Sequence, residues 1–277
     1  MPIRLIATDL DGTLLRSDHT LSQRTRRAID LANEAGVPVV PTTGRLPAMT
    51  DVLTDHGLLG PAIASNGGVG FHVGTREIFF EDPMGVDIQV RVVESLLRIL
   101  PDVRFASARR AGELLIHQEG YLEMWRLTGL KAAWARPARD LADLIDEPTI
   151  KLMAYLPGMP AEELAAVIDS FAIEGCSPTT SGVPFVEVQS SQVSKATGLA
   201  RMCAHFGVVR SEVIAFGDQR NDLEMLEWAG IGVAMGNAVP EAIEAADMVA
   251  PNNDADGLAV MVEQLIEADW EITPVRN

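Results

Sequence analysis

The first 45 residues alternate between apolar runs and a helical pattern, and this alternation constrains the fold more than any other feature. The apolar run at 5–7 predicts a buried parallel strand. A helical pattern at 22–35 follows, with Ser22 as its expected N-cap and Gly36 as its end. A second strand is expected at 37–41. A strand, a helix and a strand in this order predict a right-handed βαβ unit, and therefore an α/β fold.

The same rhythm returns in the C-terminal part of the chain. Helices are expected at 196–206 and 258–268, and strands at 212–216, 231–234 and 247–250. We interpret the two regions as halves of one doubly wound parallel sheet, with 1–82 and 188–277 forming the core domain.

A different series of elements separates these halves. Helices are expected at 86–100 and 161–171, and strands at 103–106, 114–117, 150–156 and 183–188. This order predicts an inserted α+β domain at 83–187. We expect it to act as a cap that closes over the crevice of the core and supplies specificity.

Composition limits the classes of function. The net charge of −17 and the lack of a basic run disfavour a nucleic-acid partner. No apolar run approaches the roughly 20 residues that cross a bilayer, and the first residues do not have the pattern of a signal peptide. Cys176 and Cys203 are expected to be reduced and buried. We therefore expect a cytoplasmic protein, a monomer or a homodimer, that does not bind membranes.

Acidic and hydroxyl side chains follow the ends of three predicted strands. Asp9 and Asp11 follow the first strand, Thr43 the second, and Asp218 and Asp222 a later one. Side chains two apart on a strand point to the same side, and ligands of open α/β sheets bind at the carboxyl ends of the strands. The alternative is that the first two aspartates only cap the glycine turn that follows them. Oxygen ligands without histidine or cysteine favour Mg²⁺.

Four motifs in the same order resemble those of the haloacid dehalogenase superfamily. They are Asp9-Leu10-Asp11-Gly12-Thr13-Leu14, Thr43-Gly44-Arg45, Lys195 and Gly217-Asp218-x-x-Asn221-Asp222. More narrowly, the chain resembles the Cof-like phosphatases. The supporting segments include Ser65-Asn66-Gly67-Gly68, Ala234-Met235-Gly236-Asn237 and Asp254-Ala255-Asp256-Gly257. The chain departs from the common pattern at Ala196 and at Gln219-Arg220, where no reacting group is lost.

The resemblance implies a phosphatase that works through a covalent intermediate. Asp9 would be the nucleophile that forms an aspartyl phosphate, and Asp11 the general acid. Residues expected to bind the phosphate or substrate are Thr43, Gly44, Arg45, Asn66, Lys195 and Asn221. Residues expected to bind Mg²⁺ are Asp9, Asp11 through its main-chain carbonyl, Asp218, and Asp222 either directly or through water. The implied substrate is a small phosphorylated metabolite, such as a sugar phosphate or a phosphorylated cofactor.

Two other functions remain open. A phosphomutase would use the same Asp9 but return the phosphate to another position of a sugar. A regulator that binds a sugar phosphate without turnover would need neither a nucleophile nor an acid, so the complete set of motifs argues against it.

Several weaker patterns are interpreted as structural. The spacing from Asn252 to Glu263 approaches an EF-hand calcium loop but lacks an entering helix, so we expect this loop to cap the helix at 258–268 near the crevice. Trp125 and Trp134 are expected in the core of the inserted domain, and Arg220 at the solvated surface. The glycines at 67, 68, 70 and 74 are interpreted as hairpin glycines.

Overall fold

The computed structural model describes residues 2–122, 134–180 and 183–272, so Trp125 lies outside the described residues. The chain forms two compact units. The first comprises Met1–Gly44, Asp51–Phe80 and Ser194–Asn277, and the second Arg45–Thr50 and Glu81–Val193.

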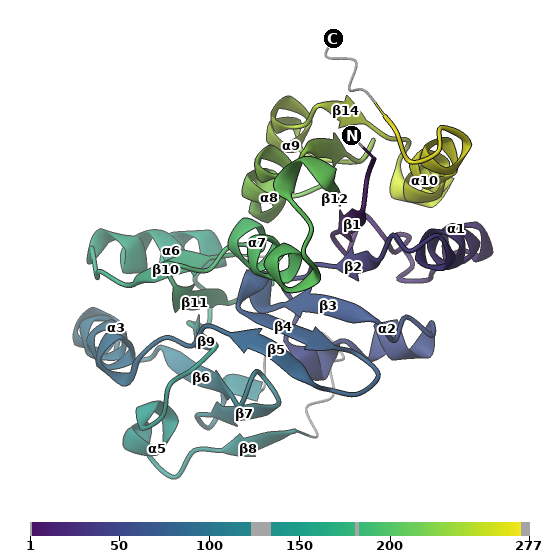
Figure 1. Ribbon diagram of the computed structural model, residues 1–277. Helices are drawn as coiled ribbons and strands as arrows, with labels where there is room; N and C mark the ends of the chain where they lie inside the picture. The colour runs from purple at the N-terminus through teal and green to yellow at the C-terminus, as the bar shows by residue number, and fades with distance from the viewer. Residues whose placement is uncertain (1, 123–133, 181–182, 273–277) are drawn as a thin grey trace. The chain divides into compact units, whose positions relative to one another are not determined.

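The first unit contains a five-stranded parallel sheet in the order β14-β13-β12-β1-β2 (Figure 1). Its strands are β1 (Leu5–Thr8), β2 (Val39–Pro41), β12 (Val213–Gly217), β13 (Ile231–Ala234) and β14 (Met248–Val249). Leu5 of β1 pairs with Val213, and Ile6 pairs with Val39 on the other side. The strand order reverses direction between β1 and β12, so a crevice is expected at their carboxyl ends.

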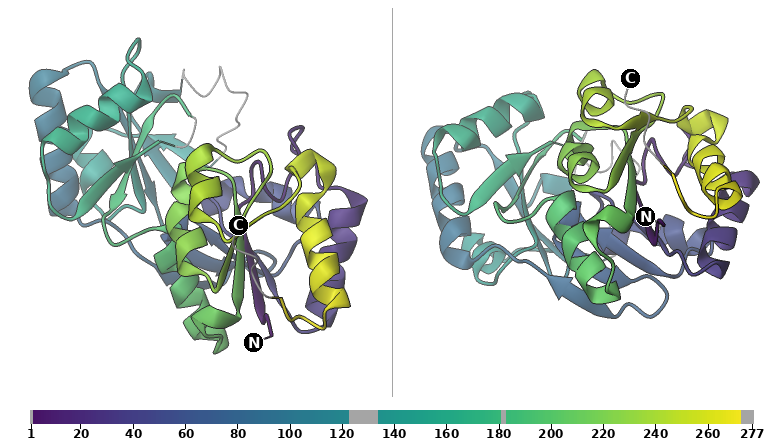
Figure 2. Two further views of the ribbon diagram at one scale, coloured as in Figure 1. Left: turned by 90° about the horizontal axis from the view of Figure 1, so that it is seen from above. Right: turned by 45° about the horizontal axis from the view of Figure 1, so that its top comes forward.

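Helices cover both faces of this sheet (Figure 2). Helix α1 (Gln23–Glu34) packs against α10 (Gly257–Glu267) on one face, and α7 (Lys195–Phe206), α8 (Leu223–Trp228) and α9 (Pro240–Ala245) cover the other. The expected cap of α1 is confirmed, because Ser22 Oγ accepts a hydrogen bond from Thr25 N at 3.0 Å. Gly36 follows α1 with φ of +80°, a conformation that suits glycine at a helix end. The predicted doubly wound parallel sheet is therefore confirmed.

A smaller three-stranded sheet extends the first unit. It contains β3 (Pro61–Ala64), β4 (Val69–His72) and β5 (Ile78–Glu81), and the short helix α2 (Asp51–Asp55) precedes it. The connection from β3 to β4 contains Gly67, with φ of +106°. A Cβ atom at Gly67 would lie 1.9 Å from the carbonyl oxygen of Ser194. Glycine at this turn therefore lets the small sheet approach the beginning of α7.

The second unit contains a six-stranded mixed sheet in the order β10-β11-β9-β6-β7-β8. Its strands are β6 (Arg104–Arg109), β7 (Leu114–His117), β8 (Ala135–Pro137), β9 (Lys151–Tyr155), β10 (Cys176–Thr179) and β11 (Val186–Ser190). Its helices are α3 (Val86–Ile99), α5 (Leu141–Ile145) and α6 (Ala161–Ser170). The inserted α+β fold agrees with the sequence pattern, whereas the role of this unit as a cap stays a prediction.

The core of the second unit also includes residues that the sequence pattern did not assign to it. The segment Arg45–Thr50 belongs to this unit, and Leu46 packs in one cluster with Ala106 and Tyr121. Trp134 is partly buried against the same cluster, in line with its expected packing role. Within the described ranges, no helix of either unit has the length and apolar character needed to span a membrane.

Candidate active site

Three buried carboxylates meet at the carboxyl ends of β1 and β12. Asp9 follows β1, and its N–H donates to the carbonyl of Phe216 at 2.9 Å, so the ends of the two strands are held together. Asp218 follows β12, and Asp222 lies one turn further along the chain. Each of these three side chains offers an oxygen within 4.8 Å of the other two. Among the described residues they form the one group of three carboxylates with this geometry.

Lys195 completes this group. It is the first residue of α7, and the side chain of Ser194 caps that helix by accepting from Thr197 N. The Lys195 ammonium donates to Asp9 Oδ1 and to Asp222 Oδ1, each at 2.5 Å. Its side chain is 0% exposed. A buried ammonium with two carboxylate partners is the arrangement that a low-dielectric site requires, because an unpaired buried charge is strongly unfavourable.

This group contains three carboxyl groups and only one ammonium, so negative charge is in excess when all are ionised. Burial raises the pKa of Asp9 to about 8, and the Asp222 and Asp218 carboxylates add to that rise while Lys195 opposes it. Burial and the Asp222 carboxylate also raise the pKa of Asp218. Burial alone would lower the pKa of Lys195, but Asp222 and Asp9 raise it above its usual value, so the lysine stays charged. Three carboxylates against one ammonium therefore fit a further cation, and an all-oxygen donor set fits Mg²⁺.

The Asp218 carboxylate is oriented by neighbouring side chains. Thr13 Oγ1 donates to Asp218 Oδ1 at 3.0 Å, and Gln219 Nε2 donates to Oδ2 at 3.1 Å. A Cβ atom at Gly12 would lie 2.5 Å from Asp218 Oδ2. The glycine of the first motif is therefore needed for space as well as for its positive φ of +87°.

Asp222 is held by the backbone that connects it to Asp218. Its Oδ2 accepts hydrogen bonds from the N–H groups of Asp218 and Gln219, both at 2.9 Å. Its Oδ1 is already bonded to Lys195. Both carboxylate oxygens of Asp222 thus have donors within the protein, which fixes their positions next to the other two carboxylates.

Asp11 lies outside the buried carboxylate group. Its Oδ1 is 3.6 Å from Nδ1 of His19, and both side chains are partly exposed to solvent. The expectation that Asp9 and Asp11 point to the same side, as residues two apart on a strand do, is therefore wrong. Strand β1 ends at Thr8, and Asp11 belongs to the turn beyond it. His19 was not among the expected site residues, and its φ of 63° is visible only in the structure. The expected binding of Mg²⁺ by the Asp11 carbonyl stays a prediction.

A second group of expected site residues lies beyond the ends of three strands: Thr43 and Gly44 follow β2, Asn66 follows β3, and Asn221 follows β12. Asn66 N donates to the Thr43 carbonyl at 3.0 Å, and Asn221 Nδ2 donates to Asn66 Oδ1 at 3.2 Å. A Cβ atom at Gly44 would lie 2.9 Å from Asn66 Oδ1. The Nδ2 atom of Asn66 and the Oγ atom of Ser65 are buried without a hydrogen-bond partner. Such polar atoms are usually satisfied, so a polar ligand would fit here.

Arg45 and Arg220 differ in what the structure shows. Arg45 belongs to the second unit, and its Nη1 donates to the Met49 carbonyl at 3.5 Å. Its proposed contact with substrate stays a prediction. Arg220 is exposed and pairs with Glu241 at 2.6 Å, as expected of a surface residue.

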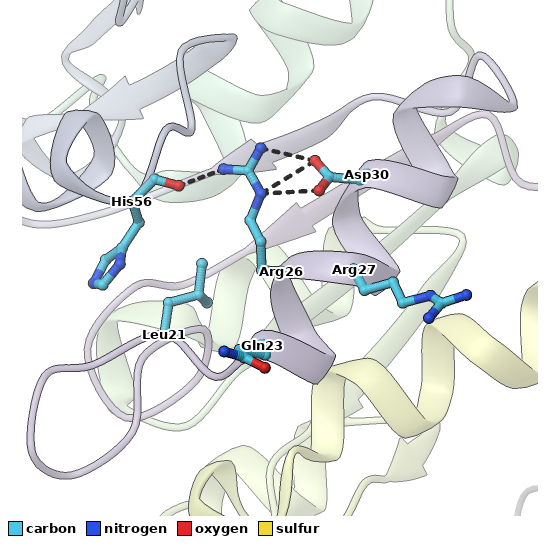
Figure 3. Close-up of a pocket in the computed structure, with 6 residues that line it drawn as sticks. All are labelled: Leu21, Gln23, Arg26, Arg27, Asp30 and His56. Atoms are coloured by element: carbon cyan, nitrogen blue, oxygen red, sulfur yellow. Dashed lines mark hydrogen bonds and ion pairs between the residues drawn. The ribbon is translucent and has the colours of Figure 1, made fainter.

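A cavity of about 310 Å³ in the first unit is separate from the carboxylate group (Figure 3). Its lining residues are Leu21, Gln23, Arg26, Arg27, Asp30 and His56. Arg26 donates to Asp30 and to the His56 carbonyl, so its guanidinium is already engaged (Figure 3). No expected site residue lines this cavity.

The loop with calcium-like spacing binds other parts of the chain. Asp256 pairs with Arg16 at 2.8 Å, and Asp254 accepts from Ser17. Glu263 pairs with Arg24. The expected helix cap is wrong, because Asp256 lies at the start of α10 but its side chain makes no capping bond. The acidic side chains connect this loop to the segment after Asp11 instead.

The carboxylates and Lys195 lie at the carboxyl ends of β1 and β12, where the strand order of the sheet reverses. This arrangement is typical of a doubly wound α/β enzyme. A family model for haloacid dehalogenase-like hydrolases matches residues 6–262. The chain belongs to this family, and the Cof-like resemblance expected from its motifs is confirmed.

Relatives of known name support this assignment. The chain is 29% identical over 279 residues to the putative phosphatase YxeH of Bacillus subtilis, covering 96% of this chain and 99% of the relative. It is 26% identical to the B. subtilis 5-amino-6-(5-phospho-D-ribitylamino)uracil phosphatase YitU, covering 94% and 96%. A haloacid dehalogenase-like hydrolase from Bacteroides thetaiotaomicron has a similar structure, with a TM-score of 0.80, 26% identity, and coverage of 95% and 99%.

Proposed function

We propose that the protein is a Mg²⁺-dependent phosphatase that hydrolyses a small phosphorylated metabolite through an aspartyl phosphate on Asp9. The observation that carries the proposal is the Lys195 ammonium bonded to both Asp9 and Asp222 within a group of three buried carboxylates. A carboxylate held beside a fixed cation, at a strand end with further oxygen ligands, suits attack on a phosphate ester.

The first half of the reaction moves the phosphoryl group to the protein. An Asp9 oxygen forms a bond to phosphorus while the bond to the ester oxygen breaks, and Asp11 gives its proton to the leaving oxygen. Lys195 stabilises charge that develops on the phosphoryl oxygens. When bound, Mg²⁺ would be held by Asp9, Asp218 and the main-chain carbonyl of Asp11, and it would reduce the repulsion between the anionic nucleophile and the anionic ester.

The second half releases inorganic phosphate. A water molecule attacks phosphorus, its proton passes to Asp11, and the bond between Asp9 and phosphorus breaks. The buried Asn66 amide, together with Thr43 and Asn221, provides donors for the phosphate oxygens. Since both oxygens of Asp222 already accept hydrogen bonds, we propose that this residue reaches the metal through water.

A phosphomutase is the second candidate, since it would need the same nucleophile. The two B. subtilis relatives described above are named phosphatases, which favours hydrolysis. One relative is named for a phosphorylated ribitylaminouracil, so sugar phosphates and phosphorylated cofactors are the first substrates to examine. We also propose a cytoplasmic location and a monomer or homodimer.

A panel of phosphorylated metabolites, assayed for inorganic phosphate with Mg²⁺ and with EDTA, tests the proposal. Phosphate release that requires Mg²⁺ is the expected result. Complete conversion of a sugar phosphate to an isomer without phosphate release would identify a mutase. Tight binding of a sugar phosphate without any turnover would identify a regulator.

Replacing Asp11 with asparagine is expected to slow the reaction according to the leaving group. Loss of the general acid should lower kcat for alkyl phosphates by about 10² to 10⁴-fold, because an alkoxide leaves poorly without a proton. Aryl phosphates, which need little protonation, should lose much less. Steady-state kinetics on one alkyl and one aryl phosphate measures the difference. Equal losses on both substrates would show that Asp11 is not the acid.

The pKa of Asp9 predicts how pH changes the stability of the metal-free protein. Because its pKa in the folded state is raised to about 8, folding favours the protonated carboxyl, and this stabilisation is lost as pH rises from the unfolded value towards 8. In EDTA the melting temperature should therefore fall between about pH 6 and about pH 8. Mg²⁺ requires the ionised carboxylate, so its stabilising effect should be larger at the higher pH.

Thermal unfolding of the wild type and of Asp9→Asn in EDTA measures this effect. The variant cannot lose the proton in question, so its melting temperature should fall less over the same range. An identical pH dependence in both proteins would contradict the raised pKa.

A further inference from the structure

Two loops of the first unit hold the segment that carries Asp11. We call residues 10–20 the 10–20 loop. Asn237, which follows β13, donates through Nδ2 to the Gly12 carbonyl at 2.8 Å. Asn253, which follows β14, donates through Nδ2 to the Leu15 carbonyl at 3.0 Å. Because all five strands are parallel, these residues come from the same edge of the sheet as Asp9.

The two asparagines are also connected to each other. The N–H of Asn253 donates to Asn237 Oδ1 at 3.0 Å. Asn237 therefore uses its oxygen towards the β14 loop and its nitrogen towards the 10–20 loop. The Asn253 side chain is buried, so its bond to Leu15 is protected from water. The result is a continuous chain of hydrogen bonds from β14 to the turn at Gly12.

Two aspartates fasten the next part of the 10–20 loop. Asp254 accepts from the N–H of Ser17 at 2.9 Å and from its hydroxyl at 2.8 Å. Asp256 accepts from Arg16 Nη2 at 2.8 Å. Asp254 is exposed, so a single one of these bonds would be weak, but a bidentate contact to a backbone N–H and a hydroxyl fixes both position and direction.

Asp11 directly precedes Gly12, the first residue of the loop that these side chains hold. It forms an isolated bridge with Leu15, and the loop closes on itself through the bond from Arg16 N to the Thr20 carbonyl at 2.9 Å. Its carboxylate faces His19 of the same loop and lies outside the buried carboxylate group. The position of Asp11 relative to Asp9 therefore depends on how the 10–20 loop is held.

We propose that Asn237, Asn253, Asp254 and Asp256 are positioning residues that hold the 10–20 loop and thereby place Asp11 for proton transfer. This inference rests on the proposed function for the role of Asp11. The four residues act through the loop and do not need to touch the substrate. The two carboxylates at 252–257 in the segment with calcium-like spacing, Asp256 and Asp254, accept hydrogen bonds from Arg16 and Ser17 and so hold the 10–20 loop.

The double variant Asn237→Ala/Asp254→Ala tests the proposal, because both positions are exposed and the buried core is left intact. Amide hydrogen exchange over residues 10–20 should become faster in the variant. Its kcat on an alkyl phosphate should fall by about tenfold, with KM unchanged and kcat on an aryl phosphate within about twofold. Asp254→Asn, which keeps an acceptor for Ser17, should stay close to the wild type.

The matched control is Glu263→Ala, which removes an exposed ion pair between α10 and Arg24 of α1 but makes no bond to the 10–20 loop. It should change neither loop exchange nor leaving-group dependence. Unchanged exchange over 10–20 in the double variant would overturn the proposal, and so would faster exchange with equal losses on both substrates. If wild type hydrolyses no phosphate ester, the proposed function and the role of Asp11 fail together, while exchange still decides whether the loop is held.

Discussion

Replacing Asp9 with asparagine is expected to abolish turnover while leaving a folded protein. The amide is a poor nucleophile, so the phosphoryl group has no acceptor, and kcat should fall by at least about 10⁴-fold. The change also removes one of three carboxylates that repel one another in a buried site. In the absence of metal the variant should therefore be at least as stable as wild type above about pH 8, where wild-type Asp9 is ionised.

Phosphate release and thermal unfolding measure the two parts of this prediction. Asp30→Asn is a suitable control, because Asp30 is a carboxylate of α1 that pairs with Arg26 and lies outside the buried group. It should keep its activity. Wild-type turnover in Asp9→Asn would show that the nucleophile is another residue, whereas an unfolded Asp9→Asn would show that this carboxylate has a structural role.

Replacing Lys195 with methionine is expected to destabilise the metal-free protein by about 3 to 5 kcal/mol and to abolish activity. The Asp9 and Asp222 carboxylates would lose their shared cation while they remain buried. Adding Asp222→Asn should restore part of the stability, because one of the uncompensated charges is then removed. Mg²⁺ should also restore stability, but not activity, since the ammonium that stabilises the phosphoryl oxygens would still be missing.

The second unit provides a matched control for this variant. Lys151 donates to Glu187 at 2.6 Å, and both side chains are buried. Lys151→Met should therefore also be destabilising, but Glu187 belongs to no group of three carboxylates in the described chain, so Mg²⁺ should not rescue it. Urea unfolding with EDTA or Mg²⁺ compares the variants. Equal rescue of both by Mg²⁺, or no loss of stability in Lys195→Met, would contradict the assigned electrostatics.

The parallel sheet was predictable from the sequence because four of its strands, β1, β2, β12 and β13, are fully buried. Strands β1 and β12 are continuous apolar runs, and α1 begins at a serine cap and ends before a glycine. Strands β8 and β10 were not expected. Their sequences, Ala135-Arg-Pro and Cys176-Ser-Pro-Thr, lack apolar alternation, so their pairing depends on neighbours distant in the chain. The packing of Leu46 in the second unit is a tertiary contact of the same kind.

Some residues of the candidate site could also be placed from the sequence, whereas others could not. Asp9 and Asp218 could be expected to meet because parallel strands bring their carboxyl ends to one edge, and the motif order added Lys195. The side chain of Asp11 could not be placed, because it lies in a turn whose shape depends on hydrogen bonds from Asn237 and Asn253. The sequence pattern of those residues resembled the family but did not reveal what they bind.

Trapping the covalent intermediate on Asp9 would test the proposed mechanism at its decisive step. A substrate labelled in its phosphate would be mixed with the enzyme and Mg²⁺, quenched with acid within one turnover, and the protein digested for mass spectrometry. We expect a labelled phosphoryl group on the peptide that contains Asp9. It should be lost in a chase with unlabelled substrate and should be absent from Asp9→Asn. Rapid turnover with no labelled protein, or a label on another residue, would contradict the proposed mechanism.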